Sequence, residues 1–234
     1  MSKIKVNDIY ILFLILVTSI IIRYPGFNYL SDSDESIYLA AAIQLKTFFL
    51  PYIGISDDTK GPLVYIINAL LYYSAGETIH GFRIIGSLFV ALTSFILFKI
   101  IEIFSFRLYS LFWSVVYIFL VTYLYTPGYL FLPAHIVNFF IVLAYYYLIK
   151  KNFFLIGLFL GLASLTKQSY IIVSVLVFFY LFFSTRKQKF FFIPLSLGYL
   201  VPFVIISLFY IYDGTLILFL KSFLRLHTLI CAIV

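Results

Sequence analysis

The stretch that decides the fold is residues 84–104, IIGSLFVALTSFILFKIIEIF, in which Lys99 and Glu102 are the only charged residues. The hydrocarbon core of a bilayer is roughly 30 Å thick, and an apolar run of about 20 residues crosses it as a helix. We therefore interpret this run as a membrane span. Comparable apolar runs lie near residues 9–22, 108–126, 134–149, 153–166, 169–184 and 190–212. Together they predict an all-α transmembrane bundle of about seven spans, or eight if the C-terminal segment also crosses.

The composition supports a membrane protein over a soluble one. The 234 residues are 64% hydrophobic and 11% charged, whereas a soluble domain is about 25% charged. The net charge of +7 comes from Lys and Arg residues scattered between the apolar runs. Because they form no basic stripe, we expect no nucleic-acid partner and interpret the lipid bilayer as the surrounding medium. The single cysteine, Cys231, can form no disulfide within the chain.

The distribution of basic residues predicts the orientation. With a cytoplasmic N-terminus, the connections on the inner side carry Lys3, Lys5, Lys99, Arg107, Lys150, Lys151, Arg186, Lys187 and Lys189. This arrangement obeys the positive-inside rule, and the opposite orientation would place all of them outside. We therefore expect a multi-pass protein of the cell membrane. We expect the final segment, residues 216–234, to be an interfacial helix.

Residues 25–82 are predicted to form a long external loop with helices on the membrane surface. The stretch Ser31-Asp32-Ser33-Asp34-Glu35 has the polar residues and the following acid that mark a helix N-terminus, and residues 37–45 continue it. Pro62 suits a first helical turn and predicts a second helix over residues 63–73. Since loops of this length are usually functional when they are ordered, the loop is the expected place for chemistry.

Asp34 and Lys60 are the candidates that the chemistry favours. Asp34 lies in the first turn of its predicted helix, where the helix dipole stabilises a carboxylate, and one turn before Tyr38. Such a carboxylate can act as a general base on a hydroxyl or help to hold a metal ion. Lys60 precedes a predicted helix start and can hold a phosphate by charge.

Each candidate also has a purely structural interpretation. An acid at a helix start is commonly a cap, and a surface lysine commonly does no more than solvate a loop. Arg83 and Lys167 lie at the ends of apolar runs, where a charged side chain either extends to the membrane surface or faces a wet cavity. The residues alone leave these alternatives open.

Three motifs in this order resemble one family of membrane enzymes. They are Asp34-Glu35-Ser36-Ile37-Tyr38, Leu50-Pro51-Tyr52 and Asp58-Thr59-Lys60-Gly61-Pro62-Leu63-Val64-Tyr65. Together they resemble the first external loop of the GT-C glycosyltransferases, which include protein O-mannosyltransferases and the lipid A aminoarabinose transferase. Residues 81–87 and 161–168 extend the resemblance, which covers most of residues 9–210.

The resemblance implies an enzyme that transfers a sugar from a polyprenyl-phosphate carrier to an acceptor on the external membrane face. The acceptor could be a glycan, a lipid or a protein. Asp34 would be the catalytic carboxylate, and Lys60 would hold the carrier phosphate. The remaining substrate-binding candidates are Glu35, Tyr38, Asp58, Arg83 and Lys167.

The chain departs from the family in two respects. Thr59 stands where some relatives have an acid or histidine before the lysine, so their metal site is not transferred to this chain, and a divalent metal stays an open alternative. No other cofactor is implied. Family members usually exceed 400 residues, so we expect residues 1–234 to be one transmembrane domain without the later spans and the soluble domain. A truncated, inactive subunit or scaffold is the alternative function, followed by a transporter or flippase subunit.

Overall fold

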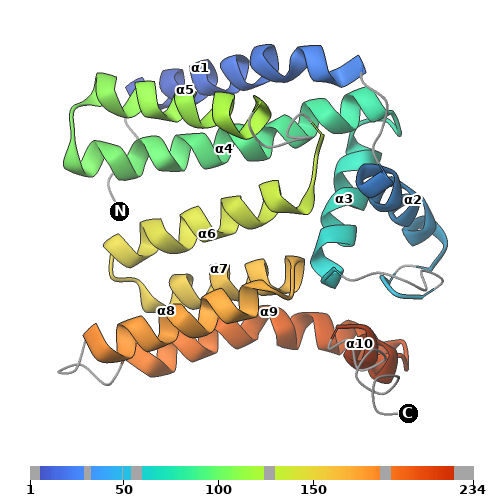
Figure 1. The fold of residues 1–234 in the computed structure, drawn as a ribbon. Coiled ribbons are helices and arrows are strands. Elements are labelled where there is room, and N and C mark those ends of the chain that lie inside the picture. The colour runs from blue at the N-terminus through green and yellow to red at the C-terminus, as the bar shows by residue number, and fades with distance from the viewer. Residues whose placement is uncertain are drawn as a thin grey trace. The chain divides into compact units, whose positions relative to one another are not determined.

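The structure is a computed structural model that describes residues 6–28, 33–48, 50–53, 60–123, 130–184 and 191–223 (Figure 1). Every regular element in these ranges is helical, which confirms the predicted all-α class. The elements are α1 (Val6–Arg23), η1 (Tyr24–Asn28), α2 (Ser33–Phe48), α3 (Pro62–Ser74), α4 (Ile79–Phe104), α5 (Arg107–Tyr123), α6 (Pro133–Ile149), α7 (Phe153–Thr166), α8 (Tyr170–Ser184), α9 (Phe192–Tyr212) and α10 (Leu216–Phe223).

Three helical segments of the described chain are long and apolar enough to cross a membrane. They are Asn7–Asn28, Ile79–Phe104 and Phe192–Tyr212. The shorter apolar helices are α3, α5, α6, α7 and α8. Each predicted apolar run is therefore a helix, but length and composition identify only these three as spans in the part of the chain that the structure describes.

The chain divides into two compact units. Unit 1 comprises Met1–Leu39 and Leu70–Val142, and unit 2 comprises Ala40–Ala69 and Leu143–Val234. The boundaries fall inside α2, α3 and α6. Each unit is described by itself below.

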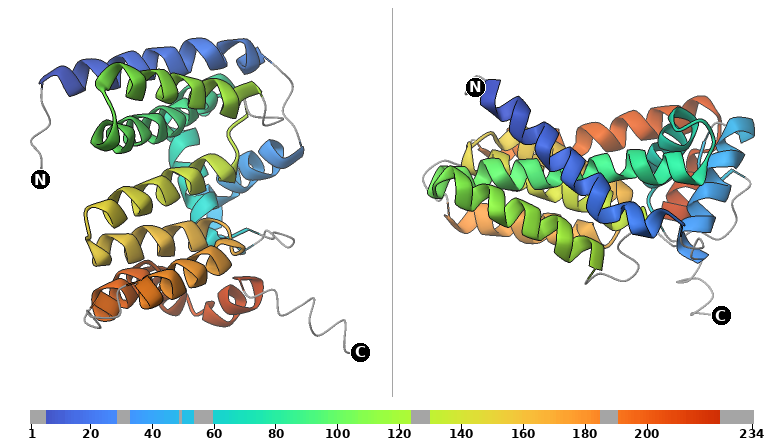
Figure 2. Two further views of the ribbon diagram at one scale, coloured as in Figure 1. Left: turned by 60° about the vertical axis from the view of Figure 1, so that its left-hand side comes forward. Right: turned by 90° about the horizontal axis from the view of Figure 1, so that it is seen from above.

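Unit 1 is built on α1, α4 and α5, which lie side by side (Figures 1 and 2). Their shared core contains Ile15, Val90, Ala91, Phe98 and Ile118. Ionic contacts join the same three helices near the N-terminus of α1, through Asp8, Lys99, Glu102 and Arg107. The three helices are thus joined both by apolar packing and by charge.

Unit 2 is built on the close contact of α7 with α9. A methyl group added at Gly157 would overlap the Leu195 carbonyl, and one added at Gly198 would overlap the Phe154 carbonyl. Glycine at these positions lets the two backbones approach, as small residues do between membrane helices. The α10 helix packs on α9, where the rings of Phe219 and Tyr210 stack with centroids 4.7 Å apart. This close packing holds α7 against α9, and the C-terminal end of α7 carries one of the candidate sites.

Candidate functional site

A fully buried ion pair holds the acidic start of α2 in unit 1. Arg83 Nη2 lies 2.5 Å from Glu35 Oε2, and Arg83 Nε donates to Glu35 Oε1 at 3.1 Å. Both side chains are 0% exposed. The two parallel bonds form the bidentate geometry that fixes orientation as well as distance. The first turn of α2 is therefore attached to the first turns of α4.

Arg83 also binds the backbone that follows α1. Its Nη1 donates to the Phe27 carbonyl at 2.8 Å and to the Gly26 carbonyl at 3.3 Å. These carbonyls belong to η1, whose short 3₁₀ geometry leaves backbone oxygens in need of partners. One guanidinium thus joins η1, α2 and α4.

A second buried arginine, Arg23, extends this network from the last turn of α1. Its Nε donates to Ser87 Oγ at 3.1 Å, and its Nη2 donates to the Leu130 carbonyl at 3.3 Å. Its Nη1 lies 3.5 Å from His135 Nε2. The Leu132 backbone N–H donates to His135 Nδ1 at 3.1 Å, so the imidazole also caps the start of α6.

The short non-helical segment 130–132 runs between these two arginines and is anchored at each residue. The Phe131 N–H donates to Glu35 Oε1 at 3.4 Å. The Phe131 ring packs directly over Gly86, where a methyl group would lie 2.7 Å from ring carbons. It also stacks on His135 with centroids 5.8 Å apart. We call Arg23, Glu35, Arg83, Ser87, His135 and segment 130–132 the arginine network.

The structure places the three predicted site residues of α2 differently. Asp34 lies in the first turn of α2, as predicted, and its side chain is outside the described part of the structure. Tyr38 is 2% exposed, so its ring belongs to the interior of unit 1. Glu35 and Arg83 are brought together, although 48 residues separate them in the chain. Their role as substrate ligands stays a prediction.

In unit 2 the backbone brings Lys60 and Lys167 to one junction. The Gly61 N–H donates to the Thr166 carbonyl at 3.1 Å. A methyl group at Gly61 would overlap the Leu165 carbonyl. Lys167 caps the C-terminus of α7, with its N–H bonded to the Ala163 carbonyl. The two lysines therefore directly flank a backbone contact between the start of α3 and the end of α7, which we call the lysine junction.

Tyr52 supports the lysine junction from a strained position. Its hydroxyl donates to the Lys60 carbonyl at 2.6 Å, and its backbone φ is +71°. A tyrosine in this region costs on the order of 1–3 kcal/mol and persists only where its surroundings fix it. The rings of Tyr65 and Tyr210 surround it, with centroids 6.2 and 6.5 Å away. Asp58, also predicted as a substrate ligand, lies outside the described residues.

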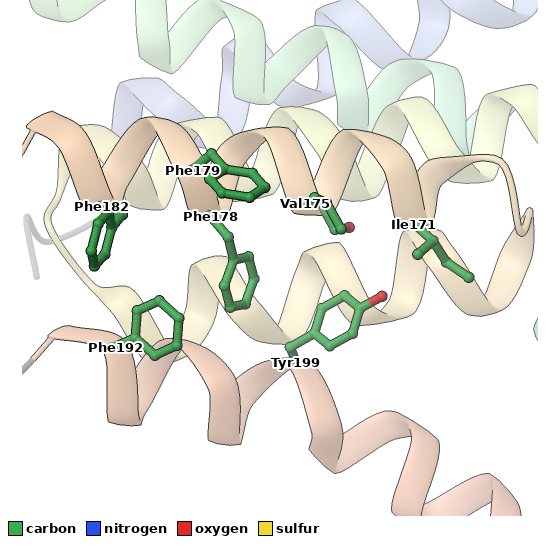
Figure 3. A pocket seen from close by; sticks show the side chains of 8 residues that line it. Ile171, Val175, Phe178, Phe179, Phe182, Phe192 and Tyr199 are labelled. Carbon is green, nitrogen blue, oxygen red and sulfur yellow. The ribbon is translucent and has the colours of Figure 1, made fainter.

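An apolar groove of about 460 Å³ lies between α8 and α9 in unit 2. Figure 3 shows Phe178 and Phe192 pointing into the space between the helices. The remaining lining residues are Ile171, Ser174, Val175, Phe179, Phe182 and Tyr199. The Tyr199 hydroxyl donates to Ser164 Oγ at 3.2 Å, so its polar end is satisfied inside the unit. Nothing in the lining can move a proton or hold an ion at neutral pH, and the groove suits a hydrocarbon chain.

No group of three His, Cys, Asp or Glu residues that could hold a metal ion occurs among the described residues. The Asp34 side chain lies outside them, so the divalent metal that Asp34 could help to hold stays an open alternative.

Arg23, His135 and Tyr52 are the site residues that sequence reasoning missed. Arg23 directly follows the apolar run 9–22, and its position alone does not distinguish it from an ordinary helix end. His135 begins a later run, and the rule that singled out Arg83, an ionisable residue at the end of an apolar stretch, applies equally to it. Tyr52 carried no signal of strain, because its φ depends on the packing of residues distant in the chain.

The chain matches no protein-family model, and no curated protein or solved structure is significantly similar to it. A function for the chain therefore rests on its own residues and their geometry.

Proposed function

We propose that this protein is a membrane glycosyltransferase of the GT-C type, which transfers a sugar from a polyprenyl-phosphate carrier to an acceptor at the external membrane face. The observation that carries the proposal is the buried Arg83–Glu35 pair, which fixes the acidic start of α2. A buried ion pair is often no more stabilising than an apolar pair of the same size. Its presence here is better explained by a need to hold one helix start in one position.

Asp34 is the proposed base. It occupies the first turn of the helix that Glu35 holds, and the positive end of the helix dipole favours a carboxylate there. In the proposed reaction the acceptor hydroxyl oxygen bonds to the anomeric carbon and its proton passes to Asp34. The bond from the anomeric carbon to the carrier phosphate breaks, and the polyprenyl phosphate leaves.

Lys60 is proposed to hold the carrier phosphate, with Lys167 as a second cation at the same junction. Negative charge grows on the phosphate as the sugar leaves, and a fixed positive charge stabilises it. The Gly61–Thr166 hydrogen bond supports this role because it keeps the two lysine backbones adjacent. The groove between α8 and α9 begins at Ile171, one turn beyond Lys167, and would accept the carrier chain.

The proposed topology has about seven spans with a cytoplasmic N-terminus, so that α2 and the lysine junction belong to the external side. In this topology the shorter helices α5 to α8 would each cross the membrane, in addition to α1, α4 and α9. Lys99, Arg107, Lys150 and Lys151 would lie inside, as the positive-inside rule requires.

The test uses purified protein in proteoliposomes with a polyprenyl-phosphate sugar labelled in the sugar, and a panel of glycan, lipid and peptide acceptors. We expect a labelled product with a new glycosidic bond and release of the unlabelled carrier. Movement of the intact donor across the bilayer without a new bond would instead identify a flippase. Neither product nor movement with any acceptor would contradict the proposal and favour a scaffold.

A further inference from the structure

Segment 130–132 is buried, non-helical backbone that leads directly into α6. Leu130, Phe131 and Leu132 are 0%, 0% and 7% exposed. Buried N–H and C=O groups need partners, and most strictly so in an apolar medium. Three of these groups are bonded by side chains: Arg23 for the Leu130 carbonyl, Glu35 for the Phe131 N–H and His135 Nδ1 for the Leu132 N–H. The Leu132 carbonyl accepts the backbone N–H of His135.

These three contacts link Arg23 and His135 to the acidic helix start. Arg23 and His135 hold the two ends of the segment, and Arg23 Nη1 lies 3.5 Å from His135 Nε2. The middle residue, Phe131, donates its N–H to the same Glu35 oxygen that Arg83 Nε binds. A shift of the segment therefore changes the position of the Glu35 carboxylate, and with it the first turn of α2.

The Phe131 ring makes this link stiff. It meets Phe82 edge-on at 5.5 Å, lies 5.5 Å from Phe89 and packs on Gly86, all on α4. On its other side it stacks on the His135 imidazole. Close-packed rings transmit small displacements because no space exists to absorb them.

We propose that Arg23 and His135 are positioning residues, which act through segment 130–132 and Glu35 to hold the first turn of α2 in its working position. The catalytic meaning of this inference rests on the proposed function, since that turn carries Asp34. The geometric claim does not, because it concerns only the attachment of α2 within unit 1.

The geometric test places a spin label on α2. The single cysteine is replaced (Cys231→Ser), and a nitroxide is attached to Ile37→Cys, a position 48% exposed on α2. In the full-length protein, His135→Leu removes both ring nitrogens, whereas His135→Gln keeps an acceptor for the Leu132 N–H. A second label at Leu92→Cys, 37% exposed on α4, reports on the rest of unit 1.

We expect His135→Leu to increase the mobility of the label at position 37 while the label at position 92 is unchanged, and His135→Gln to behave like the parent protein. An unchanged label at position 37 in His135→Leu would overturn the inference, and so would equal loosening of both labels. If His135→Leu does not fold, Ser87→Ala is judged by the same criteria. It removes the acceptor of Arg23 Nε and the Ser87 Oγ bond to the Arg83 carbonyl.

The catalytic test measures sugar transfer by the same variants. A misplacement of about 1 Å costs on the order of 10²-fold in rate, so His135→Leu should lower kcat by about that factor. The donor KM should not change, because Lys60 belongs to unit 2. His135→Gln should restore kcat. A rise in donor KM with kcat unchanged would overturn the positioning role. If the parent protein transfers no sugar, the proposed function fails, and the label mobilities still decide the geometric claim.

Discussion

The arginine network of unit 1 and the lysine junction of unit 2 are held by opposite means. The network joins four helices through buried polar side chains, among them the Arg83–Glu35 ion pair. The junction joins α3 to α7 through a backbone hydrogen bond and a glycine pressed against a carbonyl, and its lysines are only half-buried. In the arginine network the charges hold the helices together. At the lysine junction the backbone holds the elements together, so the lysine side chains can bind a ligand.

The difference predicts opposite sensitivities. Removing one charge from the network leaves another buried without its partner, which is costly. Removing a charge from the junction changes little in the fold, but adding volume there displaces backbone. Substitutions of both kinds in both regions would test whether the contrast holds.

The largest expected effect is on stability in the network. Arg83→Met leaves the Glu35 carboxylate buried without its cation and should lower the free energy of unfolding by about 3–5 kcal/mol. Arg107→Met is the matched control. Its ion pair is partly exposed and should contribute less than about 1 kcal/mol. Denaturant titration in detergent micelles, followed by circular dichroism, measures both.

The pair itself can be tested by a double substitution. Glu35→Leu with Arg83→Met removes both charges, and most of the stability lost in the single variant should return. Equal losses in the single and double variants would show that the pair is not the source of the effect.

The next effect is on activity at the lysine junction. Lys60→Met should lower kcat by about 10²- to 10³-fold, the usual result of removing one preorganised stabilising charge. Its stability should stay close to that of the parent protein. Lys46→Met, which removes an exposed lysine of α2, is the control and should retain full activity. Full activity in Lys60→Met would remove Lys60 from the site.

The smallest effect is steric. Gly61→Ala places a methyl group against the Leu165 carbonyl and should cost about 1–3 kcal/mol of stability. It should also raise the donor KM, since Lys60 must move with it. Gly76→Asn is the control, because Gly76 has open space around it and a φ of +71° that asparagine tolerates. Comparable losses in both variants would contradict the role of close packing at Gly61.

Helix positions were predictable from the sequence, and the number of spans was not. The predicted runs 134–149 and 153–166 are α6, Pro133–Ile149, and α7, Phe153–Thr166. Such runs end at proline or polar residues, so the neighbouring sequence is enough to place the ends of the helix. Whether a helix of 14 residues crosses a membrane depends on tilt and on its neighbours, which no local pattern records.

The site was predictable residue by residue but not as an arrangement. Charge at the end of an apolar run indicates Arg83 and Lys167, and a predicted helix start indicates Lys60. Glu35 is a candidate through the family resemblance. The pairing of Glu35 with Arg83, and the adjacency of the two lysines, depend on contacts between segments 48 to more than 100 residues apart. His135 lacked a distinctive neighbour in sequence, and its partner Arg23 lies 112 residues away.

The most direct test of the account is the rate of sugar transfer by Asp34→Asn, which keeps the shape of the side chain and removes the base. The account predicts a loss of about 10²- to 10⁴-fold in kcat, the usual contribution of a general base, with unchanged unfolding and donor KM. Asp213→Asn, at the exposed end of α9, should keep full activity. Undiminished transfer by Asp34→Asn would contradict the account.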